Sequence, residues 1–123
     1  MIVVMWQVSY LAAAELELEL EGLPPAEQVA IRHAVEKLQL LGIRLPAPHC
    51  KPVQGVIGAW WELRPRRGNS PWRPLYIRTS REEFVIGAVA PDGETHRREF
   101  RQAGQLAAER VTVWEKQEGM GQR

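Results

Sequence analysis

The sequence predicts one α/β (α+β) domain in which a small, antiparallel-rich sheet combines with two early helices and one final helix. Three observations predict this class. The chain has 123 residues, 45% of them hydrophobic and 25% charged, which is enough for one core but not for two. Several short runs alternate apolar with polar residues, as strands do. In other segments apolar residues recur every three or four positions, as they do in helices.

The first third of the chain is predicted to hold one strand and two helices. Residues Ile2–Tyr10 alternate like a half-buried strand. The next segment, LAAAELELELEG, is ambiguous, because its leucines alternate with glutamates as in a strand. We prefer a helix there, since Ala, Leu and Glu are strong helix formers. After Pro24 and Pro25, apolar residues recur at helical spacing until Gly42, which suits a left-handed C-terminal cap.

A connection and a strand are predicted next. The stretch RLPAPHCKPVQG is interpreted as a connection because of its prolines and glycine. The following strand is expected to place Ala59, Trp61 and Leu63 on one face, with Trp61 and Leu63 in the core. The turn signal RGNSP then predicts a hairpin with a long tip.

The second strand of this hairpin is predicted over Trp72–Arg78, and Pro74 within it indicates a bulge or an edge position because it lacks a donor. The run EEFVIGAVA completes a three-stranded meander. The remaining apolar residues recur at helical intervals, so the chain is expected to finish in a long helix. We therefore expect one domain over residues 1–118 and a flexible tail over residues 119–123.

The formal net charge is only +1, but the charges are unevenly distributed. Glutamates gather near the start at Glu15, Glu17, Glu19 and Glu21, and arginines gather centrally at Arg64, Arg66, Arg67, Arg73, Arg78 and Arg81. Opposite-signed surface regions are therefore expected.

The sequence contains no clear motif for a metal site or for a membrane-spanning segment. The single Cys50 and the three histidines form neither a disulfide nor a zinc pattern, so we expect no metal, no cofactor and a reducing, cytoplasmic location. The opening MIVVMWQVSY lacks a basic leader and a cleavage site, so we expect neither a signal peptide nor a membrane span.

The stretch WWELRPRRGNSPWRPLYIRT combines arginines with aromatic rings. One interpretation is purely structural, a hairpin whose arginines are solvated. The functional interpretation is phosphate binding, because guanidinium groups grip phosphate oxygens in pairs and exposed rings stack on bases. Arg64 and Arg73 flank the hairpin, where they can converge on one phosphate. Arg73 alternates with Leu75 and Ile77, so its head is expected to emerge at the end of the apolar face.

The elements Lys51–Gly55, Trp61–Arg64 and Trp72–Tyr76 resemble the phage-derived HigB-like branch of the RelE superfamily of type II toxins. Members of that branch carry a lysine before a Pro-Leu-Gly turn, a Trp-Glu-Leu-Arg strand and a Tyr-Arg-x-Leu-Tyr strand. The resemblance implies a RelE-like, microbial-ribonuclease-type fold that enters the ribosomal A site and cleaves messenger RNA without a metal.

The resemblance also implies site residues. By matching position, Arg73 is the sheet arginine that contacts the scissile phosphate, and Arg64 closes the preceding strand. His96 lies near the start of the last helix, where it can act as an acid or a base. The expected catalytic residues are thus Arg73, Arg64 and His96. The expected RNA-binding residues are Lys51, Arg66, Arg67, Arg78, Arg97 and Arg98.

The chain departs from the family pattern after its third meander strand. Ala90 and Pro91 stand where the family has paired lysines, Glu94 replaces a third lysine, and His96 replaces a proline. Two functions therefore remain open: a ribosome-dependent mRNA endonuclease, and a degenerate relative that binds an antitoxin-like partner or RNA without cleaving it. The expected partners are a cognate helix-turn-helix antitoxin and mRNA on the ribosome, and no membrane.

Overall fold

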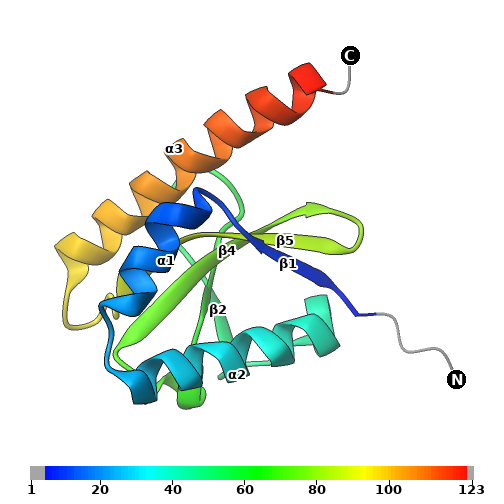
Figure 1. Cartoon of the computed structure of the whole chain (residues 1–123). Coiled ribbons are helices and arrows are strands. Elements are labelled where there is room, and N and C mark those ends of the chain that lie inside the picture. Colours follow the sequence, from blue (N-terminus) through cyan, green and yellow to red (C-terminus); the bar gives the residue numbers. More distant parts are fainter. Residues whose placement is uncertain (1–4, 122–123) are drawn as a thin grey trace, which may run out of the picture.

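A five-stranded sheet in the order β1-β5-β4-β3-β2 forms the centre of the computed structural model, which describes residues 5–121 (Figure 1). β1 is parallel to β5, and all other neighbours are antiparallel. The strands are β1 (Gln7–Tyr10), β2 (Cys50–Pro52), β3 (Trp61–Leu63), β4 (Trp72–Ser80) and β5 (Glu83–Pro91). The mixed α/β class and the antiparallel-rich sheet are confirmed.

Three helices accompany the sheet, as predicted: α1 (Ala13–Glu21), α2 (Pro25–Leu41) and α3 (Arg97–Gly121). Short 3-10 turns, η1 (Gly42–Arg44) and η2 (Pro65–Gly68), follow α2 and β3. The ambiguous LAAAELELELEG segment is helical, with Leu16 fully buried and most of its glutamates exposed. α3 continues to Gly121, so residues 119–121 are helical where a flexible tail was expected.

Helices α2 and α3 cover opposite faces of the sheet (Figure 1). The core under α2 includes Ile31, Val35, Leu38, Leu63, Tyr76 and Ile86. The core under α3 includes Trp60, Leu75, Val85, Ala88, Ala107 and Val111. Because both faces are covered, the inner strand β5 is buried without interruption from Phe84 to Ala88, and its sequence is almost wholly apolar.

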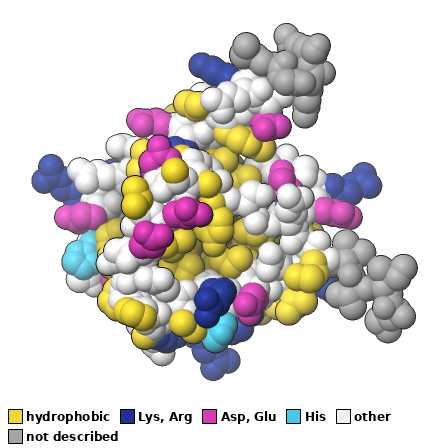
Figure 2. Space-filling model, in the orientation of Figure 1, with side chains coloured by type: hydrophobic (Ala, Val, Ile, Leu, Met, Phe, Trp, Pro, Cys, Tyr) yellow, Lys and Arg dark blue, Asp and Glu magenta, His cyan; other side chains and the backbone are white. Residues whose placement is uncertain are grey.

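Helix α1 is held to both the sheet and α3. Glu19 of α1 pairs with Arg110 of α3 at 2.9 Å, and Arg110 also donates to the carbonyl of Gly87 in β5 at 2.9 Å. Figure 2 shows acidic side chains gathered over α1, while basic side chains lie mainly towards the margins of this face. The acidic side of the expected charge separation therefore lies on α1.

The N-terminal strand begins later than predicted. Met5 and Trp6 precede β1, and Ile2–Val4 lie outside the described residues. Trp6 instead stacks on Phe84, with ring centroids 4.8 Å apart, and its backbone N–H donates to the carbonyl of Gln39. Trp6 therefore ties the start of the chain to the C-terminal end of α2.

Two predictions for the middle of the chain were wrong. The segment interpreted as a connection contains β2, which pairs with β3; its three residues, one of them Pro52, are too few to show alternation. The expected core residue Trp61 is 38% exposed, whereas Trp60 is 2% exposed. Trp60 packs against Ala107 and Val111 of α3, whereas Trp61 belongs to neither core.

A bulge, one of the two features that Pro74 indicated, is present in β5 opposite Leu75 and Tyr76 of β4. β4 pairs Leu75 with Ala88 but Tyr76 with Ile86, so Gly87 is the extra residue. β4 is not an edge strand. Pro74 is tolerated because β3 pairs only with Leu75 and Tyr76, so no ladder bond to β3 is lost at Pro74.

Within residues 5–121, none of the helices combines the length and the apolar composition needed to cross a membrane.

Gly42→Ala is expected to lower the free energy of unfolding by at least about 3 kcal/mol. Gly42 has φ +56°, and a Cβ there would lie 2.0 Å from the indole nitrogen of Trp6, so the ring must leave its stack on Phe84. Gly55→Ala is the matched control, since Gly55 has φ +78° with nothing within 4 Å; it should cost about 1–2 kcal/mol. Urea denaturation measures both, and equal losses would contradict the role given to Trp6.

Candidate functional site

Arg73 is buried on β4, with only 3% of its surface exposed. The expectation that its head emerges at the end of the sheet was wrong. Its guanidinium donates to three backbone carbonyls of the hairpin: those of Ser70, of Trp72 at 3.0 Å and of Gly68 at 3.1 Å. Arg73 therefore holds the hairpin together and does not present its guanidinium to solvent.

The hairpin tip needs such support because its backbone is strained. Arg66, Arg67 and Gly68 follow one another with φ of 53°, 57° and 95°. Non-glycine residues in this region cost about 1–2 kcal/mol each. Hydrogen bonds from a charged donor contribute about 1.5–3 kcal/mol, so the bonds from Arg73 to the tip offset that cost.

Glu62 on β3 joins the two predicted catalytic arginines. Its Oε1 accepts a hydrogen bond from Nη1 of Arg64 at 2.6 Å and lies 3.8 Å from Nε of Arg73. All three side chains are largely buried, Arg64 being the most exposed at 17%. The two arginines do converge, as the sequence predicted, but they converge on a carboxylate of the protein itself.

Electrostatics explain why this carboxylate is present. Burial and the nearby charge of Arg64 lower the pKa of Arg73, and the charge of Glu62 acts in the opposite direction. An arginine nevertheless keeps its proton in a protein. The positively charged guanidinium groups of Arg64 and Arg73 can therefore lie close together in this largely buried region only because the carboxylate of Glu62 lies between them.

The cluster lies at one side of a hollow of about 360 Å³, here called the β3–α3 hollow. Its polar and charged lining residues are Lys51, Gln54, Glu62, Arg64, Arg73, Asp92, Glu94 and Arg97. Glu62 and Arg73 lie on the sheet face that α3 covers, because Glu62 pairs with Leu75 and Arg73 lies two residues before Leu75. The hollow therefore opens where α3 begins, and four predicted site residues line it: Lys51, Arg64, Arg73 and Arg97.

Two other predicted residues lie apart from the hollow on the hairpin. Arg66 pairs with Glu27 at 2.7 Å and donates to the carbonyl of Ala26, so it ties the hairpin tip to α2. Arg67 is exposed on η2 beside it. Both side chains are outside the lining of the β3–α3 hollow.

Arg78, His96 and Arg98 also do not line the hollow. Arg78 is five residues from Arg73 along β4, about 17 Å at the usual rise of a strand. Its guanidinium donates to the carbonyls of Ser80 and Arg81 and lies 5.1 Å from the centre of the Trp6 ring. His96 and Arg98 are exposed at the start of α3, on either side of Arg97.

Acidic groups stand near the positions where the family pattern has lysines. Ala90 is buried opposite Arg73, and Asp92 and Glu94 line the hollow. Asp92 accepts a hydrogen bond from the backbone N–H of Thr95 at 2.8 Å, which lowers the pKa of its carboxyl group. A carboxylate of the protein therefore occupies part of the anion-favouring region ahead of α3.

A metal-dependent reaction has no obvious centre in the described part of the chain. Residues 5–121 contain no group of three or more His, Cys, Asp or Glu side chains placed to hold a metal ion. The ionisable groups that line the hollow are three carboxylates, of Glu62, Asp92 and Glu94, and four cationic side chains, of Lys51, Arg64, Arg73 and Arg97.

A family model described as "Phage derived protein Gp49-like (DUF891)" matches residues 18–89, more than half of the 123-residue chain. The chain belongs to the Gp49-like family. That family is known for RelE-like toxins, and the match does not single out the HigB-like branch. No curated protein and no solved structure matches the chain.

The Gp49-like match contains Glu62, Arg64 and Arg73 but ends before Asp92 and His96. The buried cluster is thus inside the family segment, and the altered region ahead of α3 is outside it. Sequence reasoning missed Glu62 as a site residue. A signal was available, because Trp60, Glu62 and Arg64 are two residues apart and share one face of a strand.

Arg73→Lys is expected to lower the free energy of unfolding by about 2–4 kcal/mol, because lysine keeps the charge but cannot reach three carbonyls and Glu62 together. The control is Arg67→Lys, an exposed position that should change stability by less than about 0.5 kcal/mol. Thermal and urea denaturation measure both. If Arg73→Lys unfolds like the parent protein, the structural role given to Arg73 is wrong.

Proposed function

We propose that this Gp49-like protein is the toxin of a type II toxin-antitoxin pair and cleaves messenger RNA on the ribosome. One observation carries the proposal: a buried carboxylate between two arginines at the side of a hollow that is also lined by Lys51 and Arg97. Membership of a family known for RelE-like toxins supports the toxin part.

The proposed reaction is attack of a ribose 2′-oxygen on the adjacent phosphate. Glu62 takes the proton of the 2′-hydroxyl, the O2′–P bond forms and the P–O5′ bond breaks. Arg64, the more exposed of the two arginines, stabilises the extra negative charge on the phosphate oxygens. Arg73 acts as a positioning residue that holds the carboxylate of Glu62 in its orientation.

The leaving 5′-oxygen needs a proton, and we assign this role to His96. His96 lies between Glu94 and Arg97, both of which line the hollow, so we expect its side chain near the rim. Lys51 and Arg97 bind flanking phosphates as fixed positive charges. The proposed antitoxin neutralises the toxin by covering this rim with a carboxylate-rich segment.

A second function, binding of RNA or an antitoxin-like partner without cleavage, is favoured by one observation. Asp92 and Glu94 line the hollow, and Ala90 and Pro91 replace the lysines of the related toxins. Each missing charge-stabilising donor costs about 3 kcal/mol of transition-state stabilisation. The first function requires cleavage of RNA and the second excludes it, so a cleavage assay separates them.

Glu62→Gln is expected to reduce mRNA cleavage by at least about 100-fold, because the amide cannot accept the 2′-hydroxyl proton. Cleavage is measured by primer extension on mRNA in a translation reaction, and toxicity by growth after induction. Glu82→Gln is the control, since Glu82 is exposed at the β4–β5 turn and should leave cleavage unchanged.

Thermal melts must accompany this comparison, because Glu62 is buried between two charges. Arg64→Lys provides a second variant that keeps the charge and Glu62, and it should cleave more slowly while staying folded. If the parent protein binds RNA but neither cleaves it nor slows growth, the second function holds and the endonuclease proposal is wrong.

Glu94→Lys is expected to tighten RNA binding, because it removes a repelling charge and restores a cation that the related toxins carry. The plot of log K against log salt should steepen by about 0.7 for one added phosphate contact. Glu82→Lys changes the net charge equally but lies at the far end of β5 from the hollow. Fluorescence anisotropy at several salt concentrations compares the two, and equal gains would indicate a general charge effect instead of a site.

A further inference from the structure

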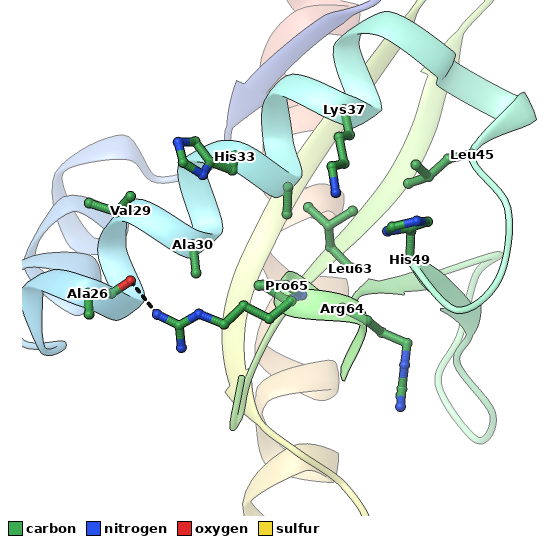
Figure 3. A pocket seen from close by; sticks show the side chains of 12 residues that line it. Ala26, Val29, Ala30, His33, Lys37, Leu45, His49, Leu63, Arg64 and Pro65 are labelled. Carbon is green, nitrogen blue, oxygen red and sulfur yellow. Dashed lines mark hydrogen bonds between the residues drawn. The ribbon is translucent and has the colours of Figure 1, made fainter. Parts of the chain in front are cut away.

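Two hollows lie on the sheet face that α2 covers, and they differ in exposure. The hollow beside α2 lies between α2 and the end of β3 (Figure 3). Most of its apolar lining is buried, and its Arg64 and Arg66 are paired with Glu62 and Glu27. The second, here called the η1 hollow, lies where α2 ends and has a volume of about 350 Å³. The proposed reaction makes no use of the η1 hollow.

The η1 hollow has a buried floor and an exposed apolar rim. Its floor includes Tyr76 and Phe84 of the core under α2. Its rim includes Ile43 of η1 and Trp61 of β3, which are 66% and 38% exposed. The last two residues of α2, Leu40–Leu41, extend this apolar surface along the chain and are 50% and 37% exposed. Contiguous exposed apolar surface of this kind marks an interaction site.

The η1 hollow also carries one positive charge. Arg78 is the charged residue among its described lining residues, since burial raises the pKa of both Cys50 and Tyr76 and keeps them neutral. Arg78 donates to two backbone carbonyls and lies 5.1 Å from the centre of the Trp6 ring. No described carboxylate lies within ion-pair distance of Arg78. A partner with a carboxylate beside an apolar anchor would therefore complement this surface.

The edge of the sheet beside the η1 hollow is poorly suited to an added strand. His49 accepts and Val53 donates a backbone hydrogen bond to β3, so by alternation Cys50 and Pro52 face the free edge of β2. Pro52 has no N–H, which leaves at most one donor, that of Cys50, for a new strand. A partner must therefore bind here through its side chains.

We propose that the η1 hollow is the docking site of an amphipathic helix of a partner protein. An apolar side chain of that helix enters the hollow between Ile43 and Trp61, and a carboxylate one turn away pairs with Arg78. The helix also covers Leu40–Leu41 at the end of α2. Under the proposed function this partner is the antitoxin, and only that naming of the partner rests on the proposed function.

A helix fits this surface better than two other occupants do. A small aromatic molecule could fill the hollow itself but would leave Leu40–Leu41 in water. A second copy of the chain, packed about a two-fold axis through the hollow, would bring two Arg78 side chains together, and like charges repel.

The test uses the whole protein and a fluorescein-labelled helical peptide built on alanine and lysine, with a stripe of leucines and one glutamate a turn beyond them. Fluorescence anisotropy should show binding to the parent protein. Ile43→Asp should weaken this binding about tenfold or more, because it removes apolar contact and neutralises Arg78. Ile57→Asp is the matched control, since Ile57 is 90% exposed and does not line the η1 hollow, and it should bind like the parent.

A second pair of variants tests the charge. Arg78→Gln should weaken binding of the glutamate peptide about two- to fivefold and leave a matched glutamine peptide unaffected. Arg81→Gln changes the net charge equally at an exposed position outside the hollow, and it should bind both peptides like the parent. Equal losses for the two peptides in Arg78→Gln would overturn the pairing given to Arg78.

Other outcomes would overturn the docking site itself. These are no binding of either peptide to the parent protein, or equal losses in Ile43→Asp and Ile57→Asp. Binding of anilinonaphthalene sulfonate that is lost in Ile43→Asp, without peptide binding, would identify a small-molecule site instead. A parent dimer that Ile43→Asp dissociates, seen by light scattering, would identify a second copy as the occupant.

The proposed RNA function is tested separately. Trp61 and Glu62 are adjacent on β3 and point to opposite faces, so the η1 hollow and the β3–α3 hollow lie on opposite sides of the sheet. Ile43→Asp should therefore bind a 2′-O-methyl oligouridylate like the parent protein. If the parent binds the peptide but not this RNA, the RNA function fails and the docking site stands.

Discussion

The ion cluster of Glu62, Arg64 and Arg73 is the interaction on which the middle of this protein depends. It joins β3 to β4 and, through the carbonyl bonds of Arg73, holds a hairpin tip whose backbone is strained. Removing one member of such a buried group leaves charge without a partner, which costs about 3–5 kcal/mol. The same cluster supplies the only carboxylate that faces both predicted catalytic arginines among the described residues.

Structure and proposed chemistry are therefore closely coupled. Arg73 gives most of its donors to the hairpin, and this leaves Arg64 as the guanidinium that can move onto a phosphate. A hydrogen bond from Nη1 of Arg64 to Glu62 holds Arg64 in place. This arrangement orients the proposed base and the proposed phosphate-binding group with one set of contacts.

The way the helices cover the sheet explains why hollows form at the end of β3. α2 covers one face and α3 the other, and at the end of β3 a hollow remains beside each helix. Arg64 lines both of them. No carboxylate lines the hollow beside α2, but its Arg64 and Arg66 are paired with Glu62 and Glu27, whereas Asp92 and Glu94 themselves line the β3–α3 hollow.

Local sequence determined much of the fold. Helical periodicity between Pro25 and Gly42 predicted α2, and the turn signals between apolar runs predicted β4 and β5. Pro74 indicated a bulge or an edge position, and a bulge is present beside it. These features depend on backbone preferences and on residues close together in the chain. The convergence of Arg64 and Arg73 was also predicted, because a hairpin brings its two strands together in a known register.

Only the tertiary structure decided which of these side chains are buried. A strand with apolar residues on both faces does not reveal which tryptophan is covered. Packing against α3 buries Trp60, whereas Trp61, on the other face, stays 38% exposed. The same packing makes Glu62 the partner of both arginines and removes Arg73 from solvent. The physical reason is that burial depends on contacts between segments far apart in sequence, and these contacts cannot be predicted from the periodicity of a single segment.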